Sequence, residues 1–220
     1  MVILGIQQTL SGVYEITSDS GSVFLLRVAY LKKVTEEQLL PYGYGRLDVD
    51  IEVDRPQKGD CGYLDEEQTK DVLEAALIYK TEVAAVAYIA RAEQSYYGLT
   101  NKLLKKGYDE STIKVCLEYL KSINYINDER YALSWLRSRS INHAEGKIRL
   151  QAELCSRGID KKTAQKALDN FFCDKDELEL CTKAYKKCIR TLTDKSKIYS
   201  SLMRKGFSYT VIKKVMKMSL

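Results

Sequence analysis

The sequence contains little proline, little histidine and no long apolar segment. Both prolines lie within the first 60 residues, so no proline interrupts helices in the remaining 160. A single histidine, His143, excludes a mechanism that needs two imidazoles. No run reaches the roughly 18 uncharged apolar residues of a membrane span, and the N-terminus lacks the basic segment and cleavage pattern of a signal peptide. We therefore expect a cytoplasmic protein with no membrane partner.

Motifs for metal, nucleotide and nucleophilic chemistry are also missing. No two of the six cysteines have the spacing of a zinc knuckle, so they are interpreted as thiols that fill the core. No phosphate-binding loop, dinucleotide fingerprint or nucleophile elbow is found, and His143 is interpreted as a solvated turn residue. We expect no cofactor, no metal and no catalytic residue. The cysteines are Cys61, Cys116, Cys155, Cys173, Cys181 and Cys188.

The first 60 residues have the alternation of β-strands. Residues 13–17 and 23–28 flank a turn-rich segment at 18–22, which predicts a hairpin. Residues 48–54 alternate strictly between acidic and apolar side chains, and we interpret the acidic face as the solvated side of a strand. The alternative is an enzyme that binds a metal through Asp50 and Glu52.

Helical signals begin after residue 64. The segment Asp65-Glu-Glu-Gln68 is typical of a capping box, and the apolar run that follows it through Ala90 is predicted to form two helices.

An internal repeat is centred on three glycines, Gly107, Gly158 and Gly206, which are 51 and 48 residues apart. Apolar residues lie eight and four positions before each glycine, and a large apolar residue and then Asp or Ser follow it. A left-handed glycine ends one helix and the Asp or Ser caps the next, so each unit is a helix, a tight turn and a helix. Upstream amphipathic segments around 83–92, 130–138 and 178–190 add a third helix to each unit.

The predicted fold is therefore mainly α, with three tandem three-helix repeats in a curved array behind a small β-containing N-terminal module. The predicted boundaries are 1–60 for the β module, 61–122 for the first repeat, 123–173 for the second and 174–220 for the third.

Positive charge is concentrated at the C-terminal end. Residues 183–220 carry a net charge of +10, whereas the rest of the chain is slightly acidic. Lysines and arginines interleaved with Tyr185, Tyr199, Phe207 and Tyr209 indicate an anionic partner, and duplex reading by the helix-turn-helix units is a minor alternative. The cations of this segment are Lys183, Lys186, Lys187, Arg190, Lys195, Lys197, Arg204, Lys205, Lys213, Lys214 and Lys217. The candidates that extend this surface are Arg91, Arg137, Arg139, Lys147, Arg149 and Arg157.

Three segments occur in a fixed order: RAEQSYYGLTNKLLKKG at 91–107, INDERYA at 126–132 and GKIRLQAELCSRGI at 146–159. Together they resemble the RecX family, which regulates the RecA recombinase. The resemblance covers roughly residues 77–217. It implies an all-helical, non-enzymatic protein that lies in the groove of the RecA filament on single-stranded DNA and limits ATP hydrolysis and strand exchange. The partners it implies are the RecA filament and, weakly or indirectly, single-stranded DNA; we expect a monomer.

Most of the matching residues are interpreted as structural. Leu150, Leu154 and Ile159 have the spacing of core positions, Asp128 is predicted to cap its helix, and the arginines are the candidate contacts. The other structural positions are Ser95, Gly107, Gly146, Gly158 and Gly206. In the third repeat Asp194 takes the place of Ser95 and Gly146. A nucleic-acid-binding protein that uses the basic C-terminal repeat without a recombinase is the main alternative.

Overall fold

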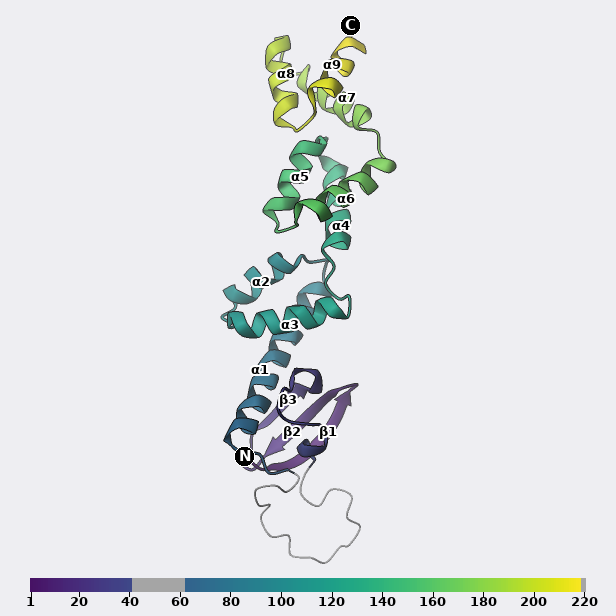
Figure 1. Cartoon of the computed structure of the whole chain (residues 1–220). Coiled ribbons are helices and arrows are strands. Elements are labelled where there is room, and N and C mark those ends of the chain that lie inside the picture. Colours follow the sequence, from purple (N-terminus) through teal and green to yellow (C-terminus); the bar gives the residue numbers. More distant parts are fainter. Residues whose placement is uncertain (41–61, 219–220) are drawn as a thin grey trace, which may run out of the picture. The chain divides into compact units, whose positions relative to one another are not determined.

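The computed structural model describes residues 1–40 and 62–218. Within them a small antiparallel sheet is followed by nine α-helices (Figure 1). The fold is thus mainly α behind a β module, as predicted. The acidic segment at 48–54 lies outside the described residues.

The sheet has the strand order β1-β2-β3, with β1 at Ile3–Leu10, β2 at Val13–Ser18 and β3 at Val23–Arg27. The predicted hairpin is confirmed by β2 and β3, which pair antiparallel from Val13 opposite Arg27 to Thr17 opposite Val23. The buried apolar side chains of the sheet come from all three strands and are Ile3, Val13, Ile16 and Leu26. Two 3₁₀ turns, Val28–Tyr30 and Glu37–Leu39, follow.

Helix α1 spans Glu66–Ile89, so the prediction of two helices in this segment was wrong. No glycine or proline interrupts the segment, and its buried positions recur at helical spacing from Asp71 to Ala85. The predicted capping box is confirmed: Gln68 N–H donates to Asp65 Oδ1 at 2.8 Å, and Asp65 N–H donates to Gln68 Oε1 at 3.1 Å.

Charged side chains of α1 attach it to the β module. The guanidinium of Arg27 donates through Nε to Glu82 at 2.8 Å, and Tyr30 Oη donates to the same carboxylate at 2.7 Å. Asp71 accepts the backbone N–H groups of residues 32–34, with the shortest contact at 2.8 Å. These buried carboxylates are satisfied by donors from the last residue of β3 and from the segment that follows it.

Three helix-turn-helix pairs follow, as the glycine spacing predicts. Gly107, Gly158 and Gly206 have φ values of 85°, 81° and 85°, in the left-handed region that ends a helix. Asp109 and Asp160 cap the next helices through backbone N–H groups, and Ser208 Oγ accepts from Val211 N–H at 3.4 Å. The pairs are α2 (Tyr96–Lys105) with α3 (Glu110–Ser122), α5 (Lys147–Ser156) with α6 (Lys161–Cys173), and α8 (Lys195–Arg204) with α9 (Tyr209–Met218).

The upstream helices complete the repeats. Repeat 1 consists of the end of α1 with α2 and α3; repeat 2 adds α4 (Asp128–Asn142) to α5 and α6; and repeat 3 adds α7 (Glu177–Cys188) to α8 and α9. Repeats 2 and 3 each have an apolar core of their own. Leu150, Leu154 and Ile159 lie in the core of repeat 2.

The chain forms two compact units. The first comprises Met1–Tyr88 and Lys102–Ile123, and the second comprises Ile89–Asn101 and Asn124–Leu220. The start of α2 therefore belongs to the same unit as repeats 2 and 3. The boundaries predicted after residues 60, 122 and 173, and the curvature of the array, stay predictions.

Candidate partner-binding surface

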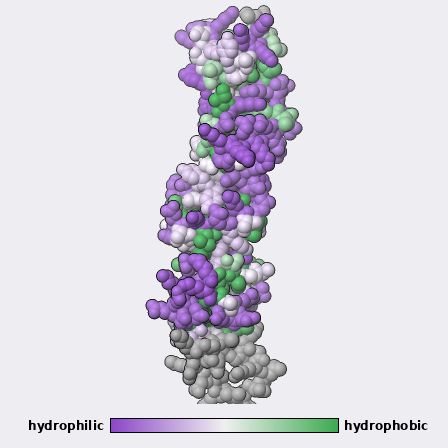
Figure 2. Space-filling model, in the orientation of Figure 1, coloured by the Kyte–Doolittle hydropathy of each residue, from purple (hydrophilic) through white to green (hydrophobic). Residues whose placement is uncertain are grey.

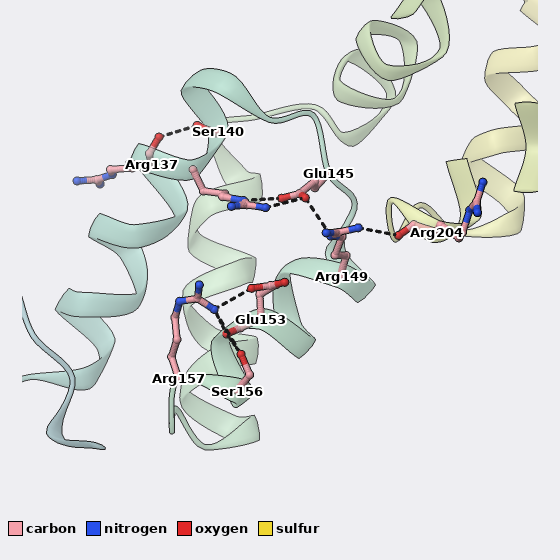
Figure 3. A network of polar contacts seen from close by, with 9 residues as sticks. Arg137, Ser140, Glu145, Arg149, Glu153, Ser156, Arg157 and Arg204 are labelled. Atoms are coloured by element: carbon pink, nitrogen blue, oxygen red, sulfur yellow. Dashed lines mark hydrogen bonds and ion pairs between the residues drawn. The ribbon is translucent and has the colours of Figure 1, made fainter. Parts of the chain in front are cut away.

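Three predicted contact arginines of repeat 2 are held in internal ion pairs. Arg139 Nε lies 2.8 Å from Glu145 Oε2, and Arg149 Nε lies 3.0 Å from Glu145 Oε1. The Glu145 carboxylate therefore pairs with both guanidinium groups. Figure 3 shows Arg149 between Glu145 and Arg204, and Arg149 Nη1 donates to the Arg204 carbonyl at 3.2 Å. Arg149 thus braces repeat 3 against repeat 2.

The buried Glu145 is the centre of this network. Its side chain is 7% exposed, and burying a carboxylate is costly unless it is paired and hydrogen-bonded. The hydrogen bond from Arg139 lowers the pKa of Glu145 below its usual value, and the same bond raises the pKa of Arg139. Both groups are therefore charged at neutral pH.

Arg157 and Lys147 are also engaged within the protein. Arg157 Nη1 lies 2.8 Å from Glu153 Oε2, and its guanidinium lies 4.5 Å from the centre of the Trp135 ring. Lys147 Nζ lies 4.9 Å from the centre of the Phe172 ring. By contrast Arg91 and Arg137 are exposed and have no ion pair among the described residues, and the Arg137 side chain points away from the network in Figure 3.

Similar hydrogen bonds connect consecutive repeats at two places in the second unit. At one joint Gly146 N–H donates to the Lys205 carbonyl at 2.9 Å and Ile148 N–H donates to the Gly206 carbonyl at 3.2 Å. At the other, Ser95 Oγ donates to the Arg157 carbonyl at 3.1 Å. Lys205 and Arg157 each precede a left-handed glycine, so the start of the middle helix of one repeat meets the turn of the next. We call this arrangement the inter-repeat joint.

Three glycines are required at these joints because atoms of the neighbouring repeat occupy the place that a Cβ would take. A Cβ on Gly206 would lie 2.3 Å from Arg149 N, and a Cβ on Gly146 would lie 2.2 Å from the Gly206 carbonyl oxygen. On Gly158 it would lie 2.2 Å from Tyr97 Cβ. Gly107 has the same φ but no atom within 4 Å of that position, so its role is limited to ending α2.

Asp128 does not cap its own helix, which corrects the prediction from the sequence. Asn127 does so, with its Oδ1 accepting from Arg130 N–H at 3.0 Å. Asp128 is instead the first residue of α4, and its Oδ1 accepts from Tyr96 N–H, the first residue of α2, at 2.9 Å. An acidic side chain at this position is favourable for the N-termini of both helices.

Glu177 repeats this arrangement at the second joint. It is the first residue of α7, and its Oε1 accepts from the N–H of Lys147, the first residue of α5, at 3.2 Å. Sequence reasoning missed both Glu145 and Glu177. The signal that could have found Glu177 is an acidic residue at the first helical position in two successive repeats.

Repeat 3 presents cations that are not paired in this way. Ten of its eleven lysines and arginines between 183 and 217 are exposed, Lys205 is half-buried, and none forms an ion pair among the described residues. Figure 2 shows that hydrophilic residues cover most of the visible surface of α7–α9. Asp194 caps α8 by accepting from Ser196 N–H at 2.8 Å.

Two hollows lie on this surface. An open groove of about 710 Å³ is lined by Lys183, Lys186 and Lys187, which share one side of α7, and by Arg190, which follows the helix. Asp174, Asp176 and Glu179 also line this groove, so its charge is mixed. A smaller pocket of about 390 Å³ lies between α7, α8 and α9 and is lined by tyrosines and lysines.

The described residues hold no group of three His, Cys, Asp or Glu side chains suited to a metal ion. Burial raises the pKa of Cys116 to about 12 and that of Cys181 to about 11, so both thiols are protonated at neutral pH. None of the described helices is long and apolar enough to cross a membrane.

Comparison with known proteins places the repeats in a family. Residues 83–120 match the first three-helix domain of RecX, and residues 127–168 match the second. The regulatory protein RecX of Treponema pallidum is 32% identical over 149 residues, which is 68% of this chain and 91% of that protein. The chain belongs to the RecX family. The RecX of Clostridioides difficile is 31% identical over 162 residues, covering 70% of this chain and 74% of that protein.

Two solved RecX structures resemble the fold. A crystal structure of regulatory protein RecX aligns over 98% of both chains with a TM-score of 0.71 and 22% identity. The crystal structure of RecX from Lactobacillus salivarius aligns over 64% of this chain and 95% of that one, with a TM-score of 0.57 and 28% identity. In this member of the RecX family the sequence signature at 146–159 coincides with the inter-repeat joint, because Gly146, Arg149 and Gly158 all take part in it.

Proposed function

We propose that this RecX-family protein binds the RecA filament on single-stranded DNA and inhibits its ATP hydrolysis and strand exchange without catalysing a reaction itself. Its membership of a family whose relatives carry the name of regulatory protein supports a regulatory role. The filament offers a long, regular surface, and a tandem array of similar repeats suits an extended partner.

The observation that carries the proposal is the contrast between the two sets of cations. Arg139, Arg149 and Arg157 are paired with acidic side chains of repeat 2, whereas the cations of repeat 3 have no ion pair among the described residues. Lysines that lack an internal partner are available to a polyanion such as a nucleoprotein filament, and they steer its approach. Repeat 3 is therefore the part of the chain that we expect to contact the filament most strongly.

The test is the single-stranded-DNA-dependent ATPase of RecA from the same organism, titrated with this protein well below one copy per RecA. Inhibition at these ratios is expected, because one copy that blocks or destabilises a filament affects many RecA subunits. An effect that appears only when the protein saturates the DNA would replace the proposal with nucleic-acid binding without a recombinase partner.

A charge variant locates the contact. Replacing Lys183, Lys186, Lys187 and Arg190 by Gln should raise the concentration needed for half-inhibition by about tenfold or more, since each lost cation removes an ionic contact. The matched control replaces four exposed lysines elsewhere, Lys105, Lys114, Lys161 and Lys162, by Gln, for the same change in net charge. Equal loss of inhibition in the two variants would contradict a specific role of repeat 3.

A further inference from the structure

The smaller pocket of repeat 3 is lined mainly by tyrosines and lysines. Tyr185, Tyr199 and Tyr209 come from α7, α8 and α9, so three different helices bring their rings to one hollow of about 390 Å³. We call it the tyrosine pocket. Tyr199 and Tyr209 meet edge to face, with ring centres 6.1 Å apart and planes inclined by 71°.

Tyr199 and Tyr209 differ in how firmly they are held. Tyr199 is half-buried and packs against the core of repeat 3, which fixes its ring. Tyr209 is the first residue of α9 and is 56% exposed. An aromatic ring that is anchored at one side and open at the other is suited to stacking on a planar ligand.

The charge of the pocket is of one sign. Its other polar lining residues are Lys195, Lys213 and Lys217, all exposed, and none of the acidic residues in the described part of the chain lines it. Lys213 Nζ lies 5.6 Å from the centre of the Tyr209 ring, so cation and ring are presented together. The larger groove on α7 differs in both respects, because acidic residues line it and tyrosines do not.

These features select one class of ligand. A cationic ligand is disfavoured by the three lysines, and a simple anion has no use for the aromatic walls. A nucleotide segment satisfies both, since its base stacks on tyrosine and its phosphates pair with lysine. We propose that the tyrosine pocket binds single-stranded nucleic acid directly, with a base against Tyr199 and Tyr209 and the flanking phosphates on Lys195, Lys213 and Lys217. This contact does not depend on RecA.

The experiment therefore omits RecA. Fluorescence anisotropy of a labelled short oligothymidylate is measured with the full-length protein across a range of salt concentrations, beside an abasic strand of the same length and charge. Wild-type protein is expected to bind the strand with bases roughly 5- to 150-fold more tightly than the abasic strand, which is the range given by the loss of one stacked base.

Two variants separate stacking from charge. Tyr209→Leu should reduce binding to oligothymidylate to the level of the abasic strand and leave the salt dependence unchanged. Lys213→Gln should lower the slope of log affinity against log salt by about 0.7, the value for one phosphate contact on a single strand. Both residues are exposed, so these variants are expected to fold, and circular dichroism checks this.

Tyr125→Leu is the matched control, because Tyr125 is 50% exposed and lies outside repeat 3. Equal affinity of wild-type protein for the two strands would overturn the proposal by showing that only phosphates are bound. Equal loss of binding in Tyr209→Leu and Tyr125→Leu would overturn it as well. Competition by polyglutamate as effective as that by oligothymidylate would assign the pocket to an acidic protein surface instead.

Discussion

At the scale of single residues, three glycines with the same backbone conformation have different neighbours. Gly107, Gly158 and Gly206 all have φ near 85°, but only the last two lie against the preceding repeat. The left-handed conformation is a local property, and its preference for glycine amounts to about 1–2 kcal/mol over other residues. The close approach of Gly158 and Gly206 to the preceding repeat is a tertiary contact, and it adds to the preference for glycine at these two positions.

Substitution by alanine separates these two contributions. Gly107→Ala should reduce the free energy of unfolding by about 1–2 kcal/mol, and Gly206→Ala by roughly 2–5 kcal/mol, because its methyl group also meets Arg149 N. Hydrogen exchange in residues 145–150 should accelerate in Gly206→Ala and stay unchanged in Gly107→Ala. Similar exchange in the two variants would show that the close approach has no energetic weight.

Glu145 gives the joint a dependence on pH. Its pKa is lowered in the folded state, chiefly by the hydrogen bond from Arg139, so its contribution to stability is fully present above its unfolded pKa of about 4.5 and is lost as pH falls through the lower folded value. The difference in unfolding free energy between wild type and Glu145→Gln should therefore be largest at neutral pH and shrink in acid. Denaturant titrations of both proteins at several pH values measure it, and a difference that does not vary with pH would contradict the assignment.

At the scale of elements, the first residue of one helix completes the N-terminus of another. Asp128 in α4 accepts from Tyr96 N–H of α2, and Glu177 in α7 accepts from Lys147 N–H of α5. The helix order and the turn glycines could be predicted from the sequence, because periodicity and capping are local. The pairing of Asp128 with Tyr96 could not be predicted. Asn and Asp are both favourable N-cap residues, so the sequence does not show whether Asn127 or Asp128 caps α4.

Replacing Asp128 tests this pairing. Asp128→Ala leaves Tyr96 N–H without its acceptor and should destabilise the second unit by roughly 1–3 kcal/mol. Glu129→Ala is the control, since it removes an acid from the same helical turn but breaks only an exposed pair with Lys166, and should cost less than about 1 kcal/mol. Denaturant unfolding followed by the fluorescence of Trp135, which lies in α4, compares the two. An equal cost would show that the bond to Tyr96 adds nothing.

The α1 helix shows another limit of local reasoning. The sequence shows a long apolar run after residue 68, and we expected it to form two helices. The unbroken series of buried positions, which includes Asp71 and Glu82, keeps it as one helix. Both carboxylates are buried because donors from Arg27 to Val34 reach them, and these donors lie too far along the chain for a pattern to reveal.

At the scale of the whole molecule, the sequence predicts which segment is positively charged, but it does not predict which cations form internal ion pairs. The net charge of +5 hides a C-terminal segment with +10, and the sequence alone identifies that segment. The arginines of repeat 2 belong to the same predicted surface, yet three of them face acidic partners inside the protein. Which cations are available to a ligand depends on the positions of Glu145 and Glu153, and these follow from the fold.

The inter-repeat joint has a consequence for protein engineering. Repeat 2 supplies both sides of the inter-repeat joint. Asp128 and the turn at Gly158 accept hydrogen bonds from the preceding repeat, and the N–H groups of Gly146 and Lys147 donate to the following repeat. A duplicate of residues 124–173 inserted after residue 173 would therefore meet matching groups at both of its ends. The number of repeats then becomes a design variable, and a simple duplication is expected to give a longer protein with an additional repeat.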